Sequence, residues 1–133
     1  ISAILRSATI TGADFSGAKL IGADLQGAIA TSGTFKGTLL TGVDLRAARF
    51  TNADCSEARF TGADLRGAIF AKANLRNADF GGANLVGANL VGANIKGANF
   101  ADALVAGMRL SQGTPFPPGA ITETKVISLQ EGD

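Results

Sequence analysis

The chain has 133 residues, of which 46% are hydrophobic and 17% charged, a composition typical of one globular domain. Twelve Lys and Arg residues against eleven Asp and Glu residues give a net charge of +1, so the chain lacks the strong field that attracts nucleic acid or an anionic membrane surface. It has one Cys, which excludes an internal disulfide, and no apolar run near the roughly 20 residues that span a bilayer. We therefore expect no nucleic acid among its partners and no membrane span.

A five-residue repeat begins at Ala3 and continues to Gly107 without an insertion or deletion, which gives 21 consecutive units. The first residue of the unit is Ala in 18 units, the second is Asp or Asn in 11, and the fifth is Gly in 13. The third residue is large and apolar everywhere except at Ala30 and Cys55. Such a fixed period indicates a repeat architecture and outweighs local helix or strand preference.

Residues five apart do not share a face of a helix or of a strand, so neither element can bury all the large third residues. A chain that turns a corner after every unit can do so. If four units make one coil of 20 residues, the first and third residues point inward, and the frequent Gly at the fifth position lets the backbone bend. We expect the coils to stack about 4.8 Å apart, with backbone hydrogen bonds between them.

The third residues support this 20-residue period when they are sorted by coil side. One side carries an aliphatic column, and another carries three consecutive phenylalanines. Like side chains stacked on like are typical of stacked-strand structures. The two columns are Leu5, Leu25, Leu45, Leu65, Leu85 and Val105, and Leu20, Leu40, Phe60, Phe80 and Phe100.

Runs such as "ADLRGAIFAKANLRNADF" and "GANLVGANL" resemble the pentapeptide-repeat proteins, whose consensus is A-(D/N)-L-x-x. The resemblance covers residues 3–107. It implies an all-β fold, a right-handed quadrilateral parallel β-helix of about five coils, which would form a solenoid roughly 25 Å long. It also implies an origin in photosynthetic bacteria or a plastid, with the cytoplasm and the thylakoid lumen both open as the compartment.

The two ends of the predicted solenoid differ. Residues 108–133 contain three prolines and break the repeat, so we predict that they form a cap, with Phe116 over the last coil near Phe100 and Val105. Within this tail the sequence weakly indicates a short strand at Val126, Ile127 and Leu129.

No comparable segment covers the first coil, and the chain begins at Ile1 rather than Met. We expect either that an upstream or targeting segment has been removed, or that a second copy closes this end. The second case predicts a homodimer through Ile4, Leu5 and Ile10.

Little in the sequence predicts chemistry. His, Tyr and Trp are absent, and we expect no catalytic, cofactor-binding or metal-binding residues. Cys55 occupies an inward position and is predicted to be a buried, inert thiol. Asp24, Asp44 and Asp64 fall in one column, but Arg6, Arg46 and Arg66 lie two residues along on the same side, which favours an ion-pair ladder over a site. The asparagines at second positions are expected to bond to the backbones of adjacent coils or to each other, namely Asn74, Asn84, Asn89, Asn94 and Asn99.

The sequence thus favours a non-enzymatic scaffold that binds another protein through its rigid faces. Exposed apolar residues near arginines are typical of interface centres, and they define a candidate protein-contact surface. Ile29 and Ile69 are predicted to lie on one face, and Ile21 and Leu39 diagonally on another. The residues of the surface are Ile21, Ile29, Leu39, Arg49, Arg59 and Ile69.

Two other functions stay open. The resemblance implies, as an alternative, a DNA mimic that inhibits a type II topoisomerase, since well-known members of the family do so. Those members are strongly acidic, whereas residues 1–107 carry ten basic and eight acidic groups, which disfavours mimicry of a polyanion. Ice binding through the threonine column Thr11, Thr31 and Thr51 has weaker support, because no complete second column accompanies it.

Overall fold

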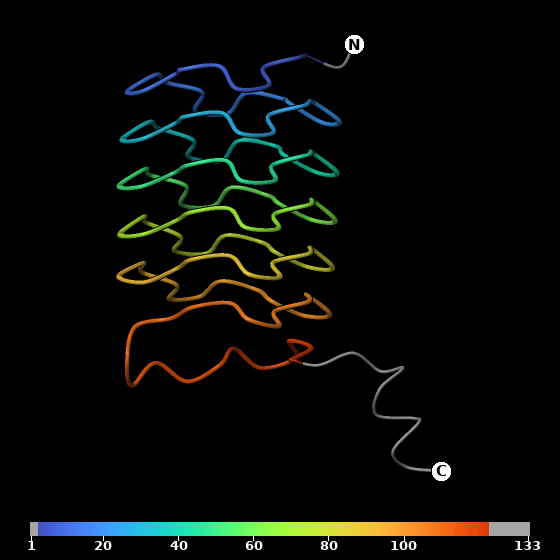
Figure 1. The fold of residues 1–133 in the computed structure, drawn as a ribbon, viewed down its shortest axis with the longest axis vertical. Coiled ribbons are helices and arrows are strands. Elements are labelled where there is room, and N and C mark those ends of the chain that lie inside the picture. Colours follow the sequence, from blue (N-terminus) through green and yellow to red (C-terminus); the bar gives the residue numbers. More distant parts are fainter. Residues whose placement is uncertain (1–2, 123–133) are drawn as a thin grey trace.

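The computed structural model describes residues 3–122 as a rod of stacked coils, shown in Figure 1. Within these residues there is no helix and no continuous strand, and the sheet consists of single parallel bridges. Every bridge except the last, Leu104 to Ile121, joins a residue to the one 20 positions later, as Ile4 to Asp24 and Asp24 to Asp44. The predicted 20-residue coil is confirmed by this register.

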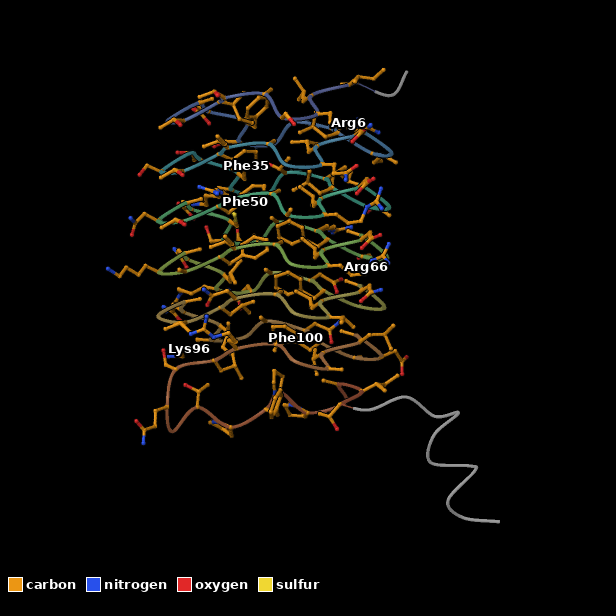
Figure 2. The ribbon with its side chains drawn as sticks, in the orientation of Figure 1. Arg6, Phe35, Phe50, Arg66, Lys96 and Phe100 are labelled. Atoms are coloured by element: carbon orange, nitrogen blue, oxygen red, sulfur yellow. The ribbon has the colours of Figure 1, made fainter. Side chains whose placement is uncertain are left out.

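The 20-residue bridges fall in four columns, because each joins the second residue of one unit to the second residue of the unit four later. We name a face after each column and include in it all units whose second residue lies there. Faces 1 and 3 are opposite sides of the rod, as are faces 2 and 4, and Figure 2 shows Arg6 and Arg66 of face 1 across the rod from Lys96 of face 3. The columns are Ile4, Asp24, Asp44, Asp64, Asn84 and Leu104 for face 1; Thr9, Ile29, Arg49, Ile69, Asn89 and Arg109 for face 2; Asp14, Thr34, Asp54, Asn74 and Asn94 for face 3; and Lys19, Leu39, Arg59, Asp79 and Asn99 for face 4.

A tight turn closes each corner. The N–H of the next unit's first residue donates to the carbonyl of the third residue, as from Ala8 to Leu5 at 3.0 Å. The fifth residue has a positive φ in every unit, which type II turns require at this place and which glycine adopts at least cost. Eight units tolerate another residue there, with φ between 57° and 61°: Ser7, Ser32, Ala47, Asn52, Glu57, Lys72, Asn77 and Asp102.

The Asp or Asn at the second position satisfies a backbone donor within its own unit. In all eleven such units the side-chain Oδ1 accepts the N–H two residues on, as in Asp14 with Ser16 at 2.9 Å. The prediction that the asparagines bond to neighbouring coils was therefore wrong for four of the five. Only Asn99 also reaches another coil, donating from Nδ2 to Asp79 at 3.0 Å. The reason is distance, since a short side chain reaches the N–H of its own turn first.

The first and third residues form the core, as predicted. Nearly all are fully buried between Ala23 and Leu90, with small first residues alternating with large third residues. The phenylalanine rings stack along their columns, with centroids 4.9 Å apart for Phe60–Phe80 and again for Phe80–Phe100. Between columns they meet edge to face, as Phe35 does with Phe50 at 4.9 Å. Figure 2 shows Phe35, Phe50 and Phe100 of this set inside the rod.

The stacking register extends past the predicted boundary at Gly107. Arg109 bridges Asn89, and Met108 is buried at the inward first position. From Ser111 the chain takes a shorter path, so that Ile121 pairs with Leu104 after only 17 residues. The predicted strand at Val126, Ile127 and Leu129 lies outside the described residues.

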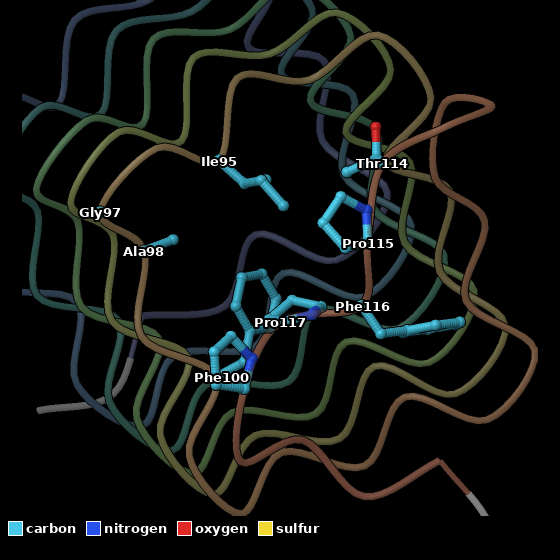
Figure 3. A pocket seen from close by; sticks show the side chains of 9 residues that line it. Ile95, Gly97, Ala98, Phe100, Thr114, Pro115, Phe116 and Pro117 are labelled. Atoms are coloured by element: carbon cyan, nitrogen blue, oxygen red, sulfur yellow. The ribbon is translucent and has the colours of Figure 1, made fainter.

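The expectation that Phe116 covers the last coil was wrong. It lines the end cavity together with Phe100, but its side chain is 51% exposed. Figure 3 shows its ring turned away from Ile95 and Ala98, while Pro115 and Pro117 lie on the side nearer to them. The prolines fix φ in this segment and so limit which side chains can turn inward.

Candidate functional site

The ion-pair ladder predicted on face 1 is present. Arg66 donates from Nη2 to Asp64 at 2.6 Å, and Arg46 donates to Asp44 at 2.7 Å. Asp24 has Gln26 in place of an arginine in its own unit, and it pairs instead with Arg6 of the preceding coil, also at 2.7 Å. These carboxylates are therefore occupied by guanidinium groups.

The ladder sets the protonation of its members. The hydrogen bond from the Arg66 side chain lowers the pKa of the Asp64 carboxyl, with help from the Arg66 backbone N–H and against a smaller effect of burial. Arg46 lowers the pKa of Asp44, and Arg6 that of Asp24, in the same way. All three stay ionised near neutral pH, so none of them has the raised pKa that a general acid needs.

Cys55 is fully buried, as predicted, and burial raises the pKa of its thiol well above the ordinary value. A thiol in this state is neither a nucleophile nor a metal ligand. Among residues 3–122 no group of three or more Cys, His, Asp or Glu is placed to hold a metal ion. No helix in that range is long and apolar enough to cross a membrane.

The structure places the two predicted parts of the protein-contact surface on opposite faces of the rod. Face 2 carries Ile29, Arg49 and Ile69, which follow one another directly in one column of bridges. Ile21, Leu39 and Arg59 belong instead to face 4, where Leu39 bridges Arg59. The six residues therefore make two candidate surfaces of three residues each, because units two apart lie on opposite sides of a four-sided coil.

The two surfaces differ in the apolar and charged neighbours of their arginines. Arg49 and Arg59 are both exposed at equivalent second positions, but the column neighbours of Arg49 are two isoleucines, whereas Arg59 lies between Leu39 and Asp79. The prediction did not include two further cations of face 2, Lys72 and Arg109. Sorting the charged residues at 20-residue intervals, as was done for the core, would have found them.

The first coil is less covered than the others. Leu5, Ile10, Phe15 and Leu20 are only partly buried, and Ile4 is 80% exposed. Among residues 3–122, no backbone N–H donates to the carbonyl oxygens of the second and fourth residues of these four units. The N–H groups of the second residues likewise have no backbone acceptor there. The predicted dimer end is thus an edge with twice as many free acceptors as free donors.

At the other end, a cavity of about 300 Å³ lies between the last regular coil and the crossing segment. Figure 3 shows Ile95, Ala98 and Phe100 on one wall, with Thr114, Pro115 and Pro117 facing them. It is lined mainly by apolar groups. The cavity lies between residues 113–118, which take the shortened path, and the last units of faces 3 and 4.

The chain matches the family model of pentapeptide repeats in 8 copies, over residues 2–37, 34–67 and 68–105. No curated protein sequence matches it. Among solved structures it is similar to the pentapeptide repeat protein Rfr23 of the cyanobacterium Cyanothece 51142, at 23% identity and a TM-score of 0.72, over 90% of each chain.

Two other structures are similar over much of the chain. A pentapeptide repeat protein from the Arabidopsis thaliana thylakoid lumen is 36% identical, with 86% of this chain and 72% of that one covered and a TM-score of 0.41. The plasmid-mediated fluoroquinolone resistance protein QnrB1 is 22% identical, over 97% of this chain and 69% of that one, with a TM-score of 0.40. The family match spans most of the 133 residues and agrees with the five-residue turns and 20-residue register of the rod. The chain belongs to the pentapeptide-repeat family.

Proposed function

We propose that the protein is a non-enzymatic scaffold that binds another protein through the flat faces of its solenoid. The observation that carries this proposal is the outward column Ile29, Arg49 and Ile69, in which apolar and cationic side chains are held at fixed spacing by backbone bridges. Arginine next to apolar anchors is typical of interface centres. A rigid frame also lowers the entropy lost on binding, because its backbone is already ordered.

The frame of this scaffold is the right-handed β-helix of about five coils that the repeat count predicts. Residues 108–133 serve in the proposal as its cap. An enzymatic role is disfavoured because the chain has no His, its Cys55 is buried, and the carboxylates of face 1 are paired with arginines.

The scaffold is tested by reversing one charge on each face and measuring recovery of partner from an extract of the source cells. The four variants are Arg66→Glu, Arg49→Glu, Arg76→Glu and Arg59→Glu, for faces 1 to 4, and each changes the net charge by the same amount. We expect one variant to lose a partner that the other three retain. If all four recover the same proteins as the unaltered chain, binding through the faces is wrong.

Inhibition of a type II topoisomerase by DNA mimicry remains the alternative, and charge disfavours it. Face 1 carries a carboxylate column, but each carboxylate is neutralised by an arginine, so no line of unpaired negative charge runs along the rod there. A mimic of duplex DNA needs such a line. A supercoiling assay should show no inhibition at equimolar protein, and inhibition that Arg66→Glu strengthens would favour mimicry instead.

We further propose that a second copy covers the first coil, through Ile4, Leu5 and Ile10. The apolar side chains support this, since burying them removes apolar surface from water at about 25 cal/mol per Å² before the cost of association. The backbone contributes less, because two such edges bring together more carbonyls than N–H groups. Light scattering should give a dimer that Ile4→Asp converts to monomer. A monomer at high concentration, or a dimer unaffected by the substitution, would contradict the proposal.

A further inference from the structure

Charge is unevenly divided among the four faces. Face 1 has three arginines and three aspartates, face 3 has three cations and three carboxylates, and face 4 has two of each. Face 2, by contrast, carries Arg49, Lys72 and Arg109 and not one Asp or Glu. The whole positive excess of residues 3–122 therefore lies on one side of the rod.

Within the described part of the chain, the cations of face 2 form no ion pair. Within residues 3–122 every ion pair involves Arg6, Arg46 or Arg66 of face 1. Arg49 is exposed, and its backbone is fixed on both sides, since its N–H donates to Ala28 at 2.9 Å and the N–H of Ile69 donates to Ala48 at 2.9 Å. An exposed arginine without a carboxylate nearby can pair with one from outside at little cost.

The surroundings of Arg49 are apolar or hydroxylic. Ile29 and Ile69 precede and follow it in the column, about 5 Å away on either side, and Thr31 and Thr51 form a parallel column on the same face. Both isoleucines are partly exposed. This is a strip in which one cation lies between two apolar anchors.

We infer that face 2 is the docking face of the scaffold, and that its partner is a protein surface presenting carboxylates together with apolar side chains. The inference rests on the proposed scaffold function and names the side of the rod that performs it. Complementary charge would orient the partner, and the isoleucines would supply the apolar contact. Face 4 lacks this property because Asp79 and Asp102 balance Lys19 and Arg59.

Two other occupants fit face 2 less well. A second copy offers no acidic face to meet it, since faces 1, 3 and 4 are balanced and face 2 would repel itself. Nucleic acid would require more cations, because proteins that bind it through phosphates commonly make about six to ten such contacts. Three cations interleaved with isoleucines match a protein surface better.

The test is an NMR titration of the full isotope-labelled chain with three probes. The first is a peptide with blocked termini and the repeating sequence Glu-Ser-Leu-Ser. In an extended chain its glutamates and leucines lie on one side and its serines on the other. The second replaces its glutamates with lysines, and the third is a DNA duplex. We expect only the first to shift Ile29, Thr31, Arg49, Thr51 and Ile69.

Arg49→Glu and Arg59→Glu form a matched pair, because both arginines are exposed at second positions and both changes reverse one charge. We expect Arg49→Glu to weaken binding of the glutamate peptide at least about tenfold and Arg59→Glu to change it less than about twofold. Equal effects of the two variants, or shifts that map to another face, would overturn the inference.

Two further outcomes would replace the proposed partner. Tighter binding of the DNA duplex than of the peptide to face 2 would make the partner a nucleic acid. Residues 123–133 contain three carboxylates and one lysine, so a chain ending at Thr122 that shows shifted face 2 resonances without any probe would make the tail the occupant. The experiment with one charge reversal on each face distinguishes failure of the scaffold proposal from failure of the choice of face 2. Loss of partner with Arg76→Glu or Arg59→Glu alone would refute the choice of face 2 and leave the scaffold standing.

Discussion

The ring of Phe80 lies parallel to the ring of Phe60 one coil earlier, with 4.9 Å between their centroids and 3° between their planes. Phe100 stacks on the other side of Phe80 at the same centroid distance. The ring of Phe80 is fully buried between them. The core of the rod is thus continuous from coil to coil, and a change at one ring is felt by both neighbours.

Removal of the Phe80 ring should be costly for this reason. We expect Phe80→Ala to lower the free energy of unfolding by about 3–5 kcal/mol, since it leaves a cavity that two stacked rings cannot fill. Asn89→Ala removes only an outward side chain that accepts the Val91 N–H, and should cost at most about 1 kcal/mol. Urea denaturation of both variants measures the difference. Equal costs would show that the inward positions are wrongly assigned.

Gly33 should resist replacement by the residue that the repeat prefers. Ala occupies most first positions, yet a Cβ at Gly33 would stand 2.8 Å from the Phe35 ring and 3.0 Å from the Ala30 carbonyl oxygen. We expect Gly33→Ala to destabilise the chain by about 1–3 kcal/mol. The cost should shrink in a Phe35→Leu background, which removes the ring. Stabilisation by Gly33→Ala in thermal unfolding would contradict this account.

Glu57 should gain from replacement by glycine. Its φ is 61°, a left-handed conformation that costs a residue with a Cβ roughly 1 kcal/mol. We expect Glu57→Gly to stabilise the chain by about 0.5–1 kcal/mol in thermal unfolding. Asn52→Gly, with φ 59°, is the matched control and should gain less, since asparagine adopts this conformation more readily. Glu57→Gln should change little, and a gain as large as that of Glu57→Gly would mean that charge, not φ, is the cause.

The Asp64–Arg66 pair should make stability depend on acid pH. The folded-state pKa of Asp64 is lowered, mainly by the Arg66 side chain, so the pair stabilises the fold above the unfolded-state pKa of about 4 and loses its effect as pH falls through the folded-state value. Asp64→Asn keeps an oxygen for the Arg66 N–H, as Asn84 does for Val86, but removes the charge.

We therefore expect urea midpoints of Asp64→Asn to vary less with pH below about 5 than those of the unaltered chain. Because the Arg66 side chain is half exposed and that of Asp64 partly exposed, the difference should be small and should fall further at high salt. A pH dependence identical in the two proteins would mean that Asp64 contributes nothing through its charge.

The sequence predicted the core of this fold well and its surface less well, for a physical reason. Inward places admit few residues, so Phe60, Phe80 and Phe100 at 20-residue spacing reveal the coil directly. Outward positions accept many residue types, and the partner of each side chain depends on which neighbouring groups lie within its length. Asp24 pairs with Arg6 of the preceding coil because its own unit offers Gln26, a choice that column order allows but does not dictate.

Where the repeat ends, the sequence predicted least. Phe116 was expected to turn inward because it is large and apolar, but the prolines beside it set the path of the backbone. For the contact surface, the sequence already placed Ile29 and Ile69 on one face and Ile21 and Leu39 on another, and the bridges put these two faces on opposite sides of the rod.

The 20-residue register has a consequence for how such a chain can change length. Inserting one five-residue unit would leave every inward side chain inward, so the protein would still fold, but it would rotate everything downstream by a quarter turn. If the unit were inserted between Arg49 and Arg109, Arg109 would leave the face 2 column and join the face 3 column of Asn74 and Asn94. Inserting four units would lengthen the rod by about 5 Å and keep all columns aligned. Among relatives, length differences in multiples of 20 would indicate a surface under selection, whereas differences of five would indicate that only the core matters.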